Sequence, residues 1–190
     1  MLRKFRDPVS GLTHLGGAVA ALVGLVALLL IGWGSWTREA SLSIYGVSLI
    51  LMMTASACYH LIKASPRWQL FLRKLDHSAI YILIAGTYTP VCMNLFSGFW
   101  NWGMLAIIWT FALVGTIVKL FVINAPRWVT VVVYIVMGWL GILAVPQMIG
   151  VLPAGALFWL LLGGVVFTLG AVVYATKKFD FFPNVFGFHE

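Results

Sequence analysis

Residues 12–33 read LTHLGGAVAALVGLVALLLIGW and contain one ionisable side chain, His14, near their start. A helix of roughly 20 apolar residues crosses a hydrocarbon core about 30 Å thick. The run is longer than the apolar region of a signal peptide, which has about 7–15 residues, and further apolar runs follow it. It therefore predicts a transmembrane helix that is retained in the mature chain.

The 190-residue chain is 62% hydrophobic and only 9% charged, with a mean hydropathy of +1.02. A water-soluble domain could not cover itself with so few charges, so membrane lipid is its expected solvent. Six runs are long enough to span a membrane and a seventh begins: 12–33, 43–61, 75–96, 100–123, 128–145, 154–175 and a truncated run at 184–190. We expect an all-α integral membrane protein, a seven-helix bundle with six complete spans plus the start of a seventh, forming one transmembrane domain over residues 1–190.

Positive charge is distributed unevenly between the connecting segments. All Lys and Arg residues except Arg38 lie before the first span, in the segments after the second, fourth and sixth spans, or, for Lys119, near the end of the fourth span. By the positive-inside rule, this bias predicts a multi-pass protein of the cell membrane with a cytoplasmic N-terminus. The net charge of +7 is then a topology signal, so we expect no nucleic-acid partner. The oligomeric state is left open.

Ionisable and hydroxyl side chains gather at the inner ends of four spans. They are Asp7, Ser10 and His14 at the first, Ser56 and His60 at the second, Asp76 and His77 at the third, and His189 and Glu190 at the seventh. Because successive spans alternate in direction, all of them fall at one depth near the cytoplasmic surface. An ionisable group costs about 2.5–3.5 kcal/mol at the centre of a span and less near its end, and it is tolerated where it meets a partner or a metal.

Several of these residues also have structural interpretations. Asp7 suits an N-cap of the first helix as well as a site, because a carboxylate is favourable at a helix N-terminus. Asp76 is open to the same interpretation or to an ion pair with Arg73, and His14 to that of a buried, hydrogen-bonded histidine. His60 and His189 lie further inside their spans. Three imidazoles, or imidazoles plus a carboxylate, with water in the fourth position form an open zinc site, so the expected cofactor is Zn²⁺.

Three motifs together resemble the hemolysin III family, the bacterial branch of the progestin and adipoQ receptor (PAQR) superfamily. They are DPVSGLTH at 7–14, SACYH at 56–60 and LRKLDHSAIYILIAGTYTP at 72–90. The resemblance covers essentially the whole chain. It implies seven helices, a cytoplasmic N-terminus and a zinc ion near the cytoplasmic face.

The resemblance also implies roles for individual residues. The S-x-x-x-H motif of the family's second helix matches Ser56 to His60, and the H-x-x-x-H motif of its seventh helix begins at His189 but is not completed. His60 and His189 are thus implied as zinc ligands, with a third imidazole one turn past Glu190. Asp76 is implied to touch the metal-bound water, with Ser56 beside the site. In a chain that ends at Glu190 we expect weak zinc binding, and His14 supplies a third nitrogen only if the first helix leans in.

Three functions are compatible with these features. The first is a zinc-dependent lipid amide or ester hydrolase, similar to the ceramidase-like chemistry attributed to the related receptors, in which Asp76 activates the water and Ser56 donates to the carbonyl oxygen. Membrane lipid would then be both solvent and possible substrate. The second is a membrane-homeostasis sensor or regulator with structural zinc. The third, a hemolysin-type pore, ranks last because a pore needs a polar lining through the full thickness of the membrane.

Overall fold

A computed structural model describes residues 5–121 and 126–176, and all regular secondary structure in these ranges is helical. The elements are α1 (Pro8–Gly32), α2 (Trp36–Leu61), α3 (Pro66–Leu95), α4 (Phe99–Phe121), α5 (Arg127–Trp139), the 3₁₀ segment η2 (Leu140–Ala144), α6 (Val145–Val151) and α7 (Ala154–Thr176). The expected start of a seventh span at 184–190 lies outside the described residues, and His189 lies there with it.

Six helical segments in the described part of the chain are long and apolar enough to cross a membrane, as the sequence predicts. Three of them begin at least four residues earlier than the apolar runs do, and the first is α1, which starts at Pro8. α2 starts at Trp36 and α3 at Pro66, where proline occupies the first helical position. Hydropathy marks the part of a helix that faces lipid, whereas backbone hydrogen bonding continues into the polar interface.

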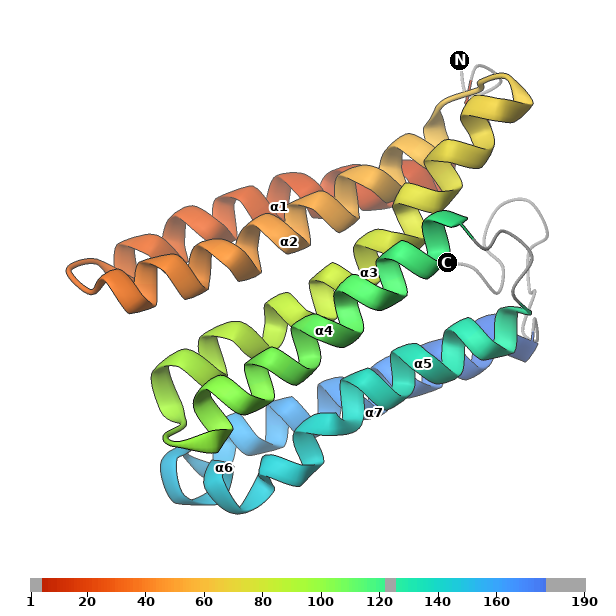
Figure 1. Ribbon diagram of the computed structural model, residues 1–190. Coiled ribbons are helices and arrows are strands. Elements are labelled where there is room, and N and C mark those ends of the chain that lie inside the picture. The colour runs from red at the N-terminus through yellow and green to blue at the C-terminus, as the bar shows by residue number, and fades with distance from the viewer. Residues whose placement is uncertain (1–4, 122–125, 177–190) are drawn as a thin grey trace.

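The helices form antiparallel pairs arranged in layers, as Figure 1 shows. α1 packs on α2, α2 on α3 and α3 on α4, while α5 packs on α7 and also contacts α3. α3 is the central helix, and its side chains Tyr81, Ile84 and Ala85 are buried in a cluster with residues of α4 and α5. The N-terminal ends of α1, α3 and α5 and the C-terminal ends of α2, α4 and α7 lie at the same end of the bundle.

The fifth span is interrupted, which the sequence did not predict. An uninterrupted helix was expected at 128–145 with a loop at 146–153, but α5 ends at Trp139, and the span continues through η2 and α6 to Val151. At the break, the Tyr88 hydroxyl of α3 donates a hydrogen bond to the carbonyl oxygens of Met137 and Gly138, at 2.9 and 2.8 Å, and accepts one from the Gly141 amide at 2.8 Å.

This hydroxyl stands between the carbonyl of Met137 and the amide of Gly141, which would bond to each other in a continuous α-helix. A side chain inserted into the helical ladder is a known cause of a kink. Gly141 leaves room for it, because a Cβ there would lie 3.2 Å from the Tyr88 oxygen. The tyrosine therefore satisfies the backbone groups that the break releases.

Candidate metal centre

The start of α1 and the end of α2 are joined by backbone hydrogen bonds. The Asp7 amide donates to the His60 carbonyl at 2.9 Å, and the Arg6 amide donates to the Leu61 carbonyl at 3.4 Å. These bonds bring the first motif, DPVSGLTH, beside the second, SACYH. The polar residues predicted at the ends of the first two spans therefore come together.

Asp7 and His60 also interact through their side chains. His60 Nδ1 donates to Asp7 Oδ2 at 2.9 Å; the imidazole is 3% exposed and the carboxylate 36%. Asp7 occupies the N-cap position of α1, but its side chain makes no capping hydrogen bond. Asp7 is therefore the N-cap residue by position, but the prediction that its carboxylate caps the helix is wrong, because its oxygen is directed to the histidine instead.

His14 lies beside this pair. Its Nδ1 donates to the Ser10 carbonyl at 2.7 Å, and its ring stacks on that of His60 with centroids 6.0 Å apart and planes 19° apart. Ser56 is buried, with its Oγ 3.5 Å from Nδ1 of His14. Since that nitrogen carries the proton it donates to Ser10, the Ser56 oxygen is the acceptor in this long contact, and its own hydroxyl proton can point elsewhere.

Asp76 and His77 form a second group on α3. His77 Nδ1 donates to the Arg73 carbonyl at 2.8 Å and lies 3.5 Å from Asp76 Oδ2. Asp76 is buried and lies well inside α3, so the N-cap interpretation is wrong for it too. Among the described residues Asp76 pairs with His77 and forms no ion pair with Arg73.

Three aromatic and basic residues of this region escaped the sequence analysis. The Tyr59 ring makes edge contacts with His60 and His77, at centroid distances of 4.9 and 6.5 Å, and it therefore lies between the two groups. The Arg6 guanidinium lies 4.0 Å above the Tyr59 ring. The Tyr134 hydroxyl of α5 donates to the His77 carbonyl at 2.6 Å. Tyr59 stands inside the SACYH motif and could have been considered there, whereas nothing in the sequence pairs Tyr134 with residues of α3.

The donor set suits zinc in part. A histidine that binds zinc usually donates its other ring N–H to a carboxylate, a carbonyl or water, and the bond from His60 Nδ1 to Asp7 has this form. Because Nδ1 of His60 carries the donated proton, the lone pair of the ring is on Nε2, and this nitrogen is buried. Within residues 5–121 and 126–176 no three His, Cys, Asp or Glu side chains are grouped so that they could hold a metal. The expected ligand His189 lies outside these ranges.

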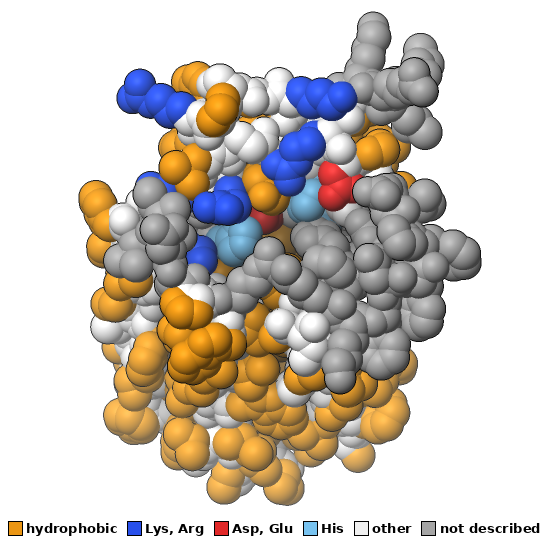
Figure 2. Space-filling model, turned by 90° about the vertical axis from the view of Figure 1, so that its right-hand side faces the viewer, with side chains coloured by type: hydrophobic (Ala, Val, Ile, Leu, Met, Phe, Trp, Pro, Cys, Tyr) orange, Lys and Arg blue, Asp and Glu red, His pale blue; other side chains and the backbone are white. Residues whose placement is uncertain are grey.

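The end of the bundle that carries these residues is basic. Figure 2 shows Lys and Arg side chains gathered on this face, with histidine and acidic side chains visible between them. Arg38 is at the opposite end, in the first turn of α2. The charge segregation expected between the connections is thus present between the two ends of the described structure.

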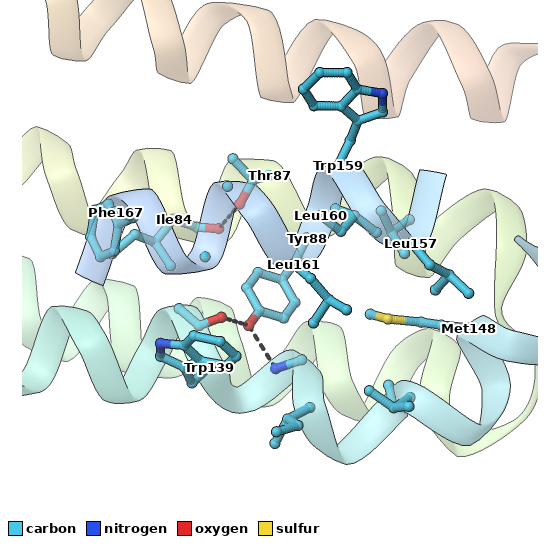
Figure 3. A pocket seen from close by; sticks show the side chains of 18 of the residues that line it. Ile84, Thr87, Tyr88, Trp139, Met148, Leu157, Trp159, Leu160, Leu161 and Phe167 are labelled. Atoms are coloured by element: carbon cyan, nitrogen blue, oxygen red, sulfur yellow. Dashed lines mark hydrogen bonds between the residues drawn. The ribbon is translucent and has the colours of Figure 1, made fainter. Parts of the chain in front are cut away.

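A separate apolar cavity of about 590 Å³ lies between α3, α5, α6 and α7 (Figure 3). Its lining is mostly aliphatic and aromatic and includes Ile84, Tyr88, Trp139, Met148, Leu160 and Phe167. Ile84 follows Asp76 by eight positions, which corresponds to about 12 Å along a helix. The cavity therefore begins roughly two helical turns from the Asp76–His77 group.

Comparison with known proteins extends over nearly the whole chain. The family model described as Haemolysin-III related matches residues 2–190. The Hemolysin-3 homolog of Bacillus subtilis (strain 168) is 35% identical over 174 residues, which are 90% of this chain and 81% of that protein. Hemolysin-3 of Bacillus cereus is 36% identical over 174 residues, which are 90% of this chain and 79% of that protein. No solved structure gives a significant match.

Proposed function

The chain is a multi-pass membrane protein of the haemolysin-III related family, and we propose that it hydrolyses an amide or ester bond of a membrane lipid with a zinc ion held at the basic end of the bundle. His60 and His189 are the proposed ligands, Asp76 and Ser56 the proposed catalytic residues. The N-terminus and this end of the bundle are proposed to face the cytoplasm.

The hydrogen bond between Asp7 and His60 carries this proposal. Because Nδ1 of His60 donates its proton to the carboxylate, the lone pair is on Nε2, the form in which a neutral imidazole binds zinc. A buried histidine fixed in one tautomer by an acidic partner is what a metal ligand requires. His14 shares the arrangement, because its Nδ1 is also a donor, here to Ser10.

When bound, zinc would polarise a carbonyl group and lower the pKa of water to about 7. The chain's own groups would do the rest. The buried Asp76 carboxylate, next to His77, would orient a water molecule and accept its proton. Ser56, whose hydroxyl proton is not needed by His14, would donate a hydrogen bond to the carbonyl oxygen of the substrate.

The apolar cavity favours a lipid as the substrate. It has a volume of about 590 Å³ and begins near Ile84, about 12 Å along α3 from Asp76. Its lining offers a hydrocarbon chain dispersion contacts but offers a polar substrate few partners. If the amide or ester bond of a lipid lies at Asp76, its hydrocarbon chain could extend along α3 into this cavity.

Metal analysis of purified protein tests the proposal. In a chain that continues through the third imidazole of the seventh-helix motif, we expect zinc in the unsubstituted protein, a large loss of zinc in His60→Ala, and largely retained zinc in Asp76→Asn, which preserves the shape of the side chain. A chain that ends at Glu190 should bind zinc weakly even with His60 intact. Lipid hydrolysis should fall by about 10² to 10⁴ in Asp76→Asn if this carboxylate is the general base. Equal zinc contents in His60→Ala and the unsubstituted protein would refute the site.

A second function, membrane sensing with structural zinc, is favoured by the position of Asp7 and His60 between two helices. Their backbone and side-chain bonds join α1 to α2, so a metal there would hold the helices together. This function predicts that zinc follows His60 while Asp76→Asn leaves every lipid assay unchanged.

The pore function has less support, although the relatives are named hemolysins. Apart from Arg38 and Glu39 at the start of α2, the described spans carry no Asp, Glu, Lys, Arg or His side chain in the half away from the basic end. We therefore expect no discrete conductance steps from purified protein in planar bilayers. Reproducible steps would favour the pore over the hydrolase.

A further inference from the structure

α3 is too long for the membrane that it crosses. Its 30 residues extend about 45 Å, whereas the hydrocarbon core is about 30 Å thick. The excess lies at its N-terminal end, because residues 66–75 contain three cations and the apolar run begins at residue 75. Residues 66–75 therefore lie at the level of the lipid headgroups.

One side of this extension faces outward. At about 100° per residue, Lys74, Arg67, Phe71, Leu75 and Trp68 follow one another around the helix within an arc of about 120°. Trp68, Phe71 and Leu75 are 62%, 45% and 37% exposed, and the first two rings are in edge contact at 5.7 Å. We call these five residues the interfacial stripe. Lys74 and Arg67 form one edge of the interfacial stripe, and the hydrophobic residues Phe71, Leu75 and Trp68 form the rest of it.

The inward side of the extension is already occupied. Gln69 donates to the Tyr59 carbonyl of α2 at 3.0 Å, and Asp76 is buried in the bundle. Arg67, which is exposed, and Lys74, which is half-buried, have no acidic partner within the described residues, where both ion pairs join a histidine to an aspartate. Lys74 donates to the carbonyl of Leu120 at the end of α4, which fixes its position but leaves its charge unneutralised.

We propose that the interfacial stripe binds the phosphate group of an anionic phospholipid in the leaflet at the basic end. Arg67 presents planar paired donors that match phosphate oxygens. Lys74 adds a fixed positive charge about two helical turns further along the same side. Trp68 and Phe71 are at the depth where aromatic rings pack among headgroups and the upper acyl chains. A soluble phosphate or a nucleic acid would leave these rings exposed to water, so a lipid is the occupant that covers both the cations and the rings of the stripe.

Local lipid composition can be measured at the stripe itself. The full chain is reconstituted in nanodiscs with a fluorophore attached through Ser65→Cys, an exposed position directly before α3, and with Cys58 and Cys92 replaced by alanine. The fluorescence is quenched either by doxyl-labelled phosphatidylglycerol or by doxyl-labelled phosphatidylcholine at equal mole fraction. The ratio of the first quenching to the second measures the local preference for the anionic lipid. A fluorophore attached through Thr37→Cys, beside Arg38 at the other end, is the matched control.

We expect a ratio above one at position 65 and near one at position 37. Arg67→Gln should lower the ratio at position 65 by up to about fivefold, the effect of one charge close to an anionic surface. Arg67→Lys keeps the charge but lacks the paired donors, so its ratio should lie between those of the unsubstituted protein and Arg67→Gln. Arg38→Gln should change neither ratio.

Three outcomes would overturn the proposal. An unchanged ratio in Arg67→Gln would remove the stripe from lipid binding. An equal loss in Arg73→Gln, an exposed cation on another side of the same turns, would assign the preference to the general positive field. Loss of the preference on adding soluble glycerol phosphate at constant ionic strength would assign the site to a free phosphate compound.

Discussion

The Asp7 carboxylate lies 2.9 Å from Nδ1 of His60, and the Asp7 amide lies 2.9 Å from the carbonyl oxygen of the same histidine. The N-cap residue of α1 thus holds both the backbone and the ring of one residue of α2. The ring cannot turn over without losing its bond to the carboxylate. The orientation of the proposed ligand is therefore set by a residue that is not itself a proposed ligand.

Replacing Asp7 should weaken zinc binding without removing it. Loss of the carboxylate partner of a metal-binding histidine typically lowers metal affinity by about 10–100-fold. We expect this loss in Asp7→Ala, measured by competition with a chromogenic zinc chelator. Asp7→Asn should lose less, because its amide oxygen can still accept the proton of Nδ1. An affinity in Asp7→Ala equal to that of the unsubstituted protein would exclude the supporting role of Asp7.

The basic end of the bundle should face the cytoplasm. All described Lys and Arg residues other than Arg38 belong to the connections or helix ends at this end, which the positive-inside rule places in the cytoplasm. In intact cells, a membrane-impermeant thiol reagent should label a chain carrying Thr37→Cys and leave one carrying Ser65→Cys unlabelled, with Cys58 and Cys92 replaced by alanine. The reverse pattern would invert the orientation and place the candidate metal centre outside.

Removing the Tyr88 hydroxyl should destabilise the protein. Tyr88→Phe leaves the Gly141 amide and the Met137 and Gly138 carbonyls without their shared partner, and an unsatisfied buried polar group costs about 1–3 kcal/mol. A lower midpoint of thermal unfolding in detergent should report this loss. Tyr45→Phe is the control, because the Tyr45 hydroxyl of α2 makes no hydrogen bond within the described structure. Equal midpoints for the two variants would show that the break does not depend on Tyr88.

A side chain at Gly86 should disturb the packing of α3 on α2. A Cβ there would lie 2.1 Å from Ser48 Oγ, and that hydroxyl is held by its own bond to the Tyr45 carbonyl at 2.7 Å. Overpacking of this kind typically costs about 1–3 kcal/mol, so Gly86→Ala should unfold at a lower temperature. Gly24→Ala adds the same methyl group to α1 where nothing lies within 4 Å, and it should be neutral or slightly stabilising. If both variants unfold alike, the close approach of the two helices is not present in solution.

The number and approximate limits of the six described spans follow from the sequence, because hydropathy reports directly on the thickness of the membrane. The break after Trp139 does not. Hydropathy runs through residues 128–151 without marking the break. Pro146 at the start of α6 is the one local sign of an interruption, and the residue that enters the helical ladder is Tyr88, on another span. The sequence around the break cannot show the contribution of Tyr88, which lies about 50 positions away.

Some features of the candidate site also follow from the sequence, and others do not. The spacing of Ser56 and His60 places both on one face of α2, and the structure buries both there. The role of Asp76 as a cap was wrong because α3 begins well before the apolar run, at a proline that hydropathy does not detect. The bond between Asp7 and His60 joins residues 53 positions apart, and only the packed helices bring them together.

The hydroxyl of Tyr88 at the break in the fifth span also bears on how the protein is made. In lipid, a backbone group without a hydrogen-bond partner costs several kcal/mol, so residues 137–141 would be poorly stable in the membrane on their own. α3 precedes α5 in the chain and leaves the ribosome first, so the tyrosine has already been synthesised when the interrupted span emerges. A chain with the order of these two spans exchanged would have to insert the break before its partner existed. The order of the spans along the chain thus makes co-translational insertion of an imperfect helix possible.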